Sequence, residues 1–192
     1  MLDYFDLLYA LNSFPEISDI SDEKEAIIEK LVNDSDTLYE YFIRDDYGTA
    51  ALAMMKKLNH DKLQVPKYIV ETAKENLIRN LTMNRDYAAV DMAIYNYSKS
   101  YRYLDFYAEQ IEVAETSIVC HQNENGSWGG EYGFFTPFAL RALIGGANNS
   151  KDILKSIERG LEYAVSDDKY LESINSSAMM QVLFYDIEKG IQ

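Results

Sequence analysis

Two adjacent carboxylates, Asp45 and Asp46, are the side chains of this sequence whose types and spacing come closest to acid catalysis. Neighbouring carboxyl groups repel each other when both are ionised, so one of them can keep its proton at a higher pH and act as a general acid. The same pair precedes a stretch rich in alanine and methionine, where it could instead cap a helix. The sequence therefore offers Asp45 or Asp46 as a candidate catalytic acid, with helix capping as the alternative.

Metal-binding and nucleophilic side chains are scarce. The cysteine and histidine residues of the chain are Cys120, His60 and His121. Adjacent side chains on a helix point about 100° apart, so Cys120 and His121 are poorly placed to share one metal ion or to form a nucleophile–base pair. The Asp-Asp-x-x-Asp motif that holds magnesium and a diphosphate is also missing. We therefore expect no metal site and no cofactor.

Aromatic residues form the third candidate group. The 16 tyrosines and 8 phenylalanines are numerous enough to build the walls of a pocket. Such walls suit an apolar ligand or a carbocation, whose charge the ring faces stabilise. Plain core packing is the alternative. The residues that we expect to line the pocket are Tyr87, Asp91, Tyr95, Phe134, Phe135 and Phe138.

Helices are the elements expected to position these groups. Only three prolines and nine glycines occur in 192 residues, so long stretches run without a helix breaker. Four alanine-rich stretches recur, and aligning them on Ala51, Ala89, Ala139 and Ala178 gives steps of 38, 50 and 39 residues. A repeat of roughly 40 residues is typical of paired helices that stack in an array.

A second kind of segment, with apolar residues spaced as on one face of a helix, precedes each alanine-rich stretch. These faces are Ile27, Ile28, Leu31 and Val32; Ile69, Ala73 and Leu77; Ile111, Ala114 and Ile118; and Leu154, Ile157, Leu161 and Ala164. We therefore predict a single all-α domain over residues 1–192, with about four consecutive αα-hairpins in an inner and outer arrangement. This would be a partial or reduced α/α toroid, and an irregular helical bundle is the alternative.

The most distinctive motif lies between the third pair of predicted helices and reads Gln122-Asn-Glu-Asn-Gly126-Ser-Trp128-Gly-Gly. It resembles the glutamine–tryptophan (QW) repeat of squalene cyclases. Residues 112–164 as a whole are similar to the repeat of protein prenyltransferase β-subunits, in the same terpenoid cyclase/prenyltransferase superfamily. The motif packs neighbouring hairpins together in that superfamily, so the resemblance implies a structural role for Gln122, Gly126 and Trp128.

The resemblance also implies a domain that binds an apolar, isoprenoid-like ligand and could act as a cyclase. The Asp-x-Asp-Asp motif with which squalene-type cyclases protonate their substrate is absent, and Asp45-Asp46 is its nearest substitute. The catalytic set is therefore incomplete. A non-catalytic αα-hairpin scaffold for protein–protein interaction, or a subunit of a larger complex, is the alternative function.

Charge and length bear on partners and location. A formal charge of −14 disfavours nucleic acid and anionic membrane surfaces. No apolar run approaches the roughly 20 residues of a membrane span. The lone cysteine and the acidic first residues favour the cytoplasm. Because a closed six-hairpin toroid needs roughly 250 residues, we expect this shorter array to be completed by homo-oligomerisation or by a protein partner.

Overall fold

The computed structural model describes residues 35–43, 48–57, 64–83, 87–130, 132–145 and 150–188. These residues form eight α-helices, one 3-10 helix and no strand, which confirms the predicted all-α class. None of these helices has both the length and the apolar character needed to cross a membrane. The helices are α3 (Ser35–Phe42), α4 (Gly48–Lys57), α5 (Lys67–Met83), α6 (Tyr87–Ser100), α7 (Ala108–Cys120), α8 (Thr136–Gly145), α9 (Lys151–Ser166), η1 (Lys169–Glu172) and α10 (Ile174–Glu188).

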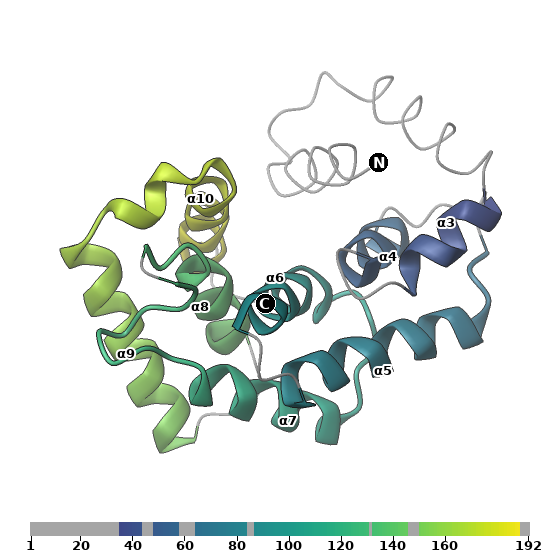
Figure 1. The fold of residues 1–192 in the computed structure, drawn as a ribbon, viewed down its shortest axis with the longest axis horizontal. Helices are drawn as coiled ribbons and strands as arrows, with labels where there is room; N and C mark the ends of the chain where they lie inside the picture. The colour runs from purple at the N-terminus through teal and green to yellow at the C-terminus, as the bar shows by residue number, and fades with distance from the viewer. Residues whose placement is uncertain are drawn as a thin grey trace.

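The helices are arranged in two curved layers (Figure 1). In the inner layer, α4 contacts α6, α6 contacts α8, and α8 contacts α10. In the outer layer, α5 contacts α7 and α7 contacts α9. Neighbouring helices also contact each other between the layers, as α5 does with α6 and α8 with α9. The first predicted outer face, Ile27 to Val32, lies outside the described residues, and a partial or reduced toroid stays a prediction.

Small side chains let the inner helices approach one another closely. Ala51 and Ala53 of α4 and Ala139 of α8 are fully buried. The close approach allows a hydrogen bond between helices, in which the backbone N–H of Ala50 donates to the Oδ1 atom of Asn96 on α6 at 3.1 Å. A side-chain acceptor of this kind also satisfies an N–H group in the first turn of α4 that has no partner within its own helix.

Buried cations join the ends of the helices. Lys74 of α5 donates to the carbonyl oxygen of Asp105 at 2.7 Å, and its Nζ atom lies 4.5 Å from the centre of the Tyr107 ring. Arg141 of α8 donates through Nη1 to the carbonyl oxygen of Ser98, near the end of α6. Two long basic side chains therefore cross the interior. Each donates a hydrogen bond to a backbone carbonyl group, one near the end of α6 and one near the end of the loop that follows it.

The predicted inward face of α9 is wrong by about one residue. Leu154 and Leu161 are exposed, and the buried residues of α9 are Ile153, Ser156, Gly160 and Tyr163. The physical reason is the indole of Trp128: the gap left by Gly160 admits the ring, and a Cβ atom at Gly160 would lie 2.7 Å from Trp128 Cζ3. Contact with the ring therefore turns small residues of α9 inward and leaves leucines outside.

Candidate functional site

The predicted aromatic residues lie on α6 and at the start of α8. The rings of Tyr95 and Phe138 pack between these helices with their centroids 4.9 Å apart, and both side chains are buried. Phe135 follows at 5.9 Å from Phe138. Phe134 is stacked on Tyr132 at 5.5 Å instead. Three of the predicted rings therefore form one cluster and the fourth forms a separate pair.

Other predicted residues fall wholly or partly outside the described structure. Asp45 and Asp46 lie outside the described residues, so their role as catalytic acids stays a prediction. Tyr87 is the first residue of α6, but its side chain is not among those described. The predicted lining of a ligand pocket therefore rests on Asp91 and the four rings above.

One face of α6 carries three chemically different groups. Asp91, Tyr95 and Lys99 are spaced four residues apart, so they lie along the same side of the helix. Burial raises the pKa of Asp91 to about 6, and the nearby His121 opposes this shift. The Nζ atom of Lys99 donates to the hydroxyl group of Tyr95 and lies 4.1 Å from the centre of its ring. The ammonium group of Lys99 therefore already lies against the Tyr95 ring, which is the ring that would stabilise a bound carbocation.

Trp128 is buried where α7, α8 and α9 meet. The side chain is 0% exposed, and its Nε1–H group donates to the carbonyl oxygen of Ile118 at 2.7 Å. Its backbone N–H donates to Oγ1 of Thr136 at 3.0 Å, which ties the loop to the start of α8. The ring lies against Gly160 of α9. A single residue thus links the three helices around the loop.

Gln122 connects the same loop to α9 through both atoms of its amide. Its Nε2 group donates to the carbonyl oxygens of Gly126 at 2.8 Å and Ser156 at 2.9 Å. Its Oε1 atom accepts from Oγ of Ser156 at 2.9 Å and from Nη1 of Arg159 at 3.3 Å. Four bonds use the hydrogen-bonding capacity of a primary amide in full. A residue of the loop is thereby fixed to α9.

Gly126 is required by the backbone of the loop. It has a φ of 92°, and a Cβ atom there would lie 2.4 Å from the carbonyl oxygen of Arg159. Both the positive φ and the close approach to α9 exclude other side chains. We call the set Gln122, Gly126, Trp128, Ser156 and Gly160 the clamp, because these residues hold α7, the loop and α9 together.

Gly160 provides a test in which two effects oppose each other. In an ordinary helix interior, changing glycine to alanine stabilises the protein by about 1 kcal/mol. Here the new methyl group would meet Trp128 Cζ3 at 2.7 Å and Leu140 Cδ2 at 2.8 Å. Overpacking of this kind costs about 1–3 kcal/mol. We expect Gly160→Ala to lower the free energy of unfolding, measured by urea denaturation, with exposed Glu158→Ala as a near-neutral control; a more stable Gly160→Ala protein would contradict the clamp.

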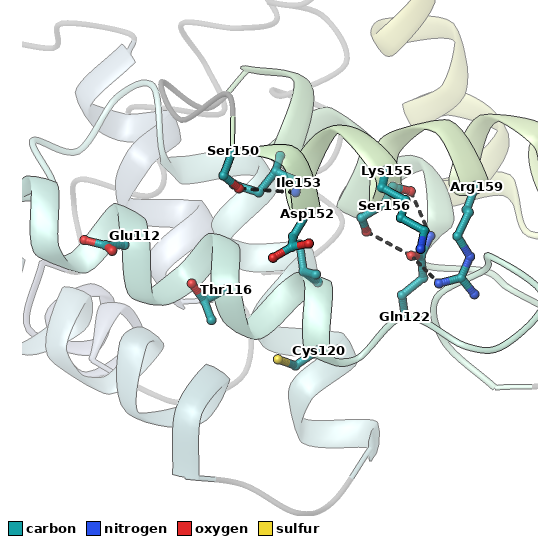
Figure 2. Close-up of a pocket in the computed structure, with 11 residues that line it drawn as sticks. Glu112, Thr116, Cys120, Gln122, Ser150, Asp152, Ile153, Lys155, Ser156 and Arg159 are labelled. Carbon is teal, nitrogen blue, oxygen red and sulfur yellow. Dashed lines mark hydrogen bonds between the residues drawn. The ribbon is translucent and has the colours of Figure 1, made fainter.

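A pocket of about 380 Å³ lies between α7 and α9, beside the clamp. Figure 2 shows Glu112 of α7 toward one end and Arg159 of α9 toward the other, with Asp152 between them. Gln122 and Ser156 form part of its wall, and none of the predicted ligand-lining residues does. The pocket therefore mixes polar and apolar side chains, carries both signs of charge and lies in the outer layer.

The reactive groups of this pocket include a thiol and a guanidinium group. Cys120 lines it and is an exposed thiol. Among the described residues, no group of three or more histidine, cysteine, aspartate or glutamate side chains could hold a metal ion. Arg159 is engaged by Gln122 and by the carbonyl oxygens of Asn123 and Glu124 at 2.9 and 2.8 Å. Its guanidinium group thus serves the clamp.

No family model, curated protein or solved structure matches this chain. The resemblance of residues 112–164 to the terpenoid cyclase and prenyltransferase repeat stays a prediction. The geometry of the clamp is defined by the contacts of this chain alone.

Sequence reasoning missed the part of the clamp that lies on α9. Gly160 interrupts an otherwise good helix, and a glycine in a helix interior often marks a close approach by another group. Ser156 is one turn earlier on the same face, and that pairing with Gly160 is the signal that could have identified the partner of Trp128. Nothing in the sequence marks Arg159 as a partner of the loop, because an arginine on the surface of a helix is usually solvated.

Sequence reasoning also missed a buried acid in α7. Glu115 is 0% exposed, and neither of its carboxylate oxygens has a hydrogen-bond partner within the described part of the chain. Burial and the neighbouring Glu112 raise its pKa to about 7. Burial, and to a lesser extent the neighbouring Glu115, raises the pKa of Tyr97 on α6. Glu115 therefore lies between the layers as a carboxyl group that favours its protonated form.

Three exposed apolar residues lie along the outside of α9. Leu154, Leu161 and Val165 are 52%, 36% and 86% exposed, and we call them the α9 stripe. Each residue of a helix advances by about 100°, so these three lie within about 40° of one another. They point roughly 140° away from Asp152 and Arg159, which line the pocket facing α7. The stripe is thus on the flank where a further outer helix would pack.

Proposed function

We propose that this chain is a non-catalytic αα-hairpin scaffold whose last hairpin binds a protein surface through the α9 stripe. The observation that carries the proposal is the exposure of Leu154, Leu161 and Val165 on one flank of α9. Large apolar side chains that line up on one side of a helix are typical of a face that packs against another element. A cytoplasmic location belongs to this proposal as well.

The order of contacts in the outer layer supports the proposal. α7 packs between α5 on one side and α9 on the other. The exposed stripe leaves the corresponding flank of α9 uncovered within the described residues. Terminal hairpins of a repeat array need either a polar outer face or a covering element, because each hairpin buries its apolar face against a neighbour. The apolar stripe favours a covering element.

Two further apolar residues of the last described hairpin are exposed. Leu171 at the end of η1 and Ile174 at the start of α10 are exposed, the latter by 86%. Both belong to the hairpin that ends the described array. Fully burying one such side chain contributes about 1.5–3 kcal/mol, so a few of them would support binding. The last hairpin therefore offers more than a single isolated leucine.

An apolar-ligand site on the inner helices is the second candidate function. It is supported by the resemblance to terpenoid cyclases and by the aromatic cluster of Tyr95, Phe135 and Phe138. Against it, Lys99 covers Tyr95, and a ligand at this place would have to displace either Lys99 or Phe138. The pocket between α7 and α9 lies in the outer layer and is lined by charges of both signs, which suits a scaffold better than a cyclase. We therefore place this candidate second.

Site-specific photocrosslinking tests the scaffold proposal. We expect p-benzoylphenylalanine at position 165 to form a protein adduct when the full chain is irradiated in expressing cells, because this position is 86% exposed on the stripe. The same residue at position 83, which is 78% exposed at the end of α5, is the matched control. Adding Leu161→Glu should abolish the adduct at 165. Equal adducts at both positions, or none, would refute the proposal.

A further inference from the structure

We infer that the partner of the α9 stripe is a second copy of this chain, bound with the two α9 helices antiparallel about a two-fold axis. This inference rests on the proposed function and identifies the protein surface that it requires. The arguments are the charge balance of α9, the order of its charges and the self-complementary spacing of the stripe.

The charge balance of α9 makes it suited to self-association. The chain as a whole carries a formal charge of −14, so two copies repel each other over most of their surface. In α9, however, Lys151, Lys155 and Arg159 balance Asp152, Glu158 and Glu162, and the helix has no net charge. The stripe therefore lies on a helix without net charge in an acidic molecule, which lessens this repulsion where two copies meet through α9.

The order of the exposed charges then selects an antiparallel arrangement. Lys151, Lys155, Glu158 and Glu162 are all exposed, and they lie on one side of the stripe with the two bases first and the two acids last. Lys155 is the one of the four furthest from the stripe, and it also lines the pocket that faces α7. This order runs against the helix dipole, which favours acids at the start of a helix and bases at its end. In a parallel pair related by a two-fold axis, the charged flank of each helix would lie beside the uncharged flank of the other, where no opposite charges meet. An antiparallel partner sets the basic half of each helix beside the acidic half of the other.

The apolar residues fit the same register. When Leu154 of one copy lies opposite Leu161 of the other, the two-fold axis repeats the contact, and Ile157 lies near its counterpart. In this register Lys155 falls between Glu158 and Glu162 of the second copy, because the rise is 1.5 Å per residue. In the commonest form of homodimer, the same surface patch of both copies meets across a two-fold axis. The stripe and its charged border are thus complementary to themselves.

The mass of the purified full chain in solution is the first test. We expect light scattering after size exclusion to give twice the chain mass of 22.1 kDa at micromolar concentration. Leu161→Glu should weaken the dimer by about 100-fold, because each copy would bury an unpaired charge. Met83→Glu, the same change of charge outside the stripe, should remain dimeric. Circular dichroism should be unchanged in both, since the substituted side chains are exposed.

Charge reversal tests the antiparallel register. Lys155→Glu and Glu162→Lys should each weaken the dimer by about tenfold, and the double variant should recover most of the loss, because it restores opposite charges across the axis. A double variant no better than the single variants would overturn the register. A wild-type chain that is monomeric throughout would overturn the second copy as the partner. In that case a photoadduct at position 165 with a different protein would leave the scaffold proposal intact, whereas no adduct would refute both.

Discussion

Trp128→Ala is expected to lower the free energy of unfolding by about 4 kcal/mol, within the range of about 3–5 kcal/mol for buried aromatic residues. The indole is 0% exposed and fills the space between α7, α8 and α9. Its removal leaves a cavity that these helices cannot close, because Gln122 and Thr136 hold the loop from two sides. Far-UV circular dichroism during urea unfolding measures the loss.

Trp128→Phe is the matched variant. It keeps an aromatic ring in the cavity but removes the Nε1–H group that donates to the carbonyl oxygen of Ile118. That carbonyl also accepts from the backbone N–H of His121, so it is not left without a donor. We expect a loss of about 1–2 kcal/mol, between the wild type and Trp128→Ala. Equal stability of the alanine variant and the wild type would show that the indole does not hold the outer helices together.

Glu115→Gln is expected to change how stability depends on pH. The pKa of Glu115 is about 7 in the folded chain, against 4.5 for an ordinary glutamate, because burial favours its neutral form. Between these values the folded state binds a proton that the unfolded state has released, so the wild type loses stability as pH rises from about 4.5 to 7. The loss reaches about 3 kcal/mol above pH 7.

The glutamine variant stays neutral and should not show this loss. We therefore expect the difference in unfolding free energy between Glu115→Gln and the wild type to shift in favour of the variant by about 2–3 kcal/mol from pH 4.5 to pH 8. A constant cost of the amide cancels in that difference. Urea unfolding at several pH values measures it, with Glu109→Gln on the exposed side of α7 as the control. Parallel pH profiles of Glu115→Gln and the wild type would contradict a buried carboxyl group at this position.

Sequence periodicity predicted the outer helices well where packing follows the apolar residues. Ile69, Ala73 and Leu77 of α5 are buried, as are Ala114 and Ile118 of α7. The prediction failed on α9, where Leu154 and Leu161 are exposed. A helix with a clean apolar face turns that face inward only when nothing larger competes for the same space. On α9 the indole of Trp128 competes, and Gly160 admits it.

The candidate site was predictable only in part. Gln122, Gly126 and Trp128 could be selected from their spacing, but their partners Ser156 and Gly160 lie about 30 residues further along the chain. Contacts over such distances depend on how the outer helices pack, which local spacing does not record. The burial of Glu115 is of the same kind, because a glutamate in an amphipathic helix is usually solvated.

The sequence by itself determined that this chain is helical, that alanine-rich helices alternate with amphipathic ones, and that one glycine-rich loop carries a tryptophan. These properties are local, since propensity and periodicity act over a few turns. Only the tertiary structure decided which face of α9 is buried, where the indole lies and which charges remain outside. Those outcomes depend on competition between side chains from three helices for one volume, and close packing leaves room for only one of them.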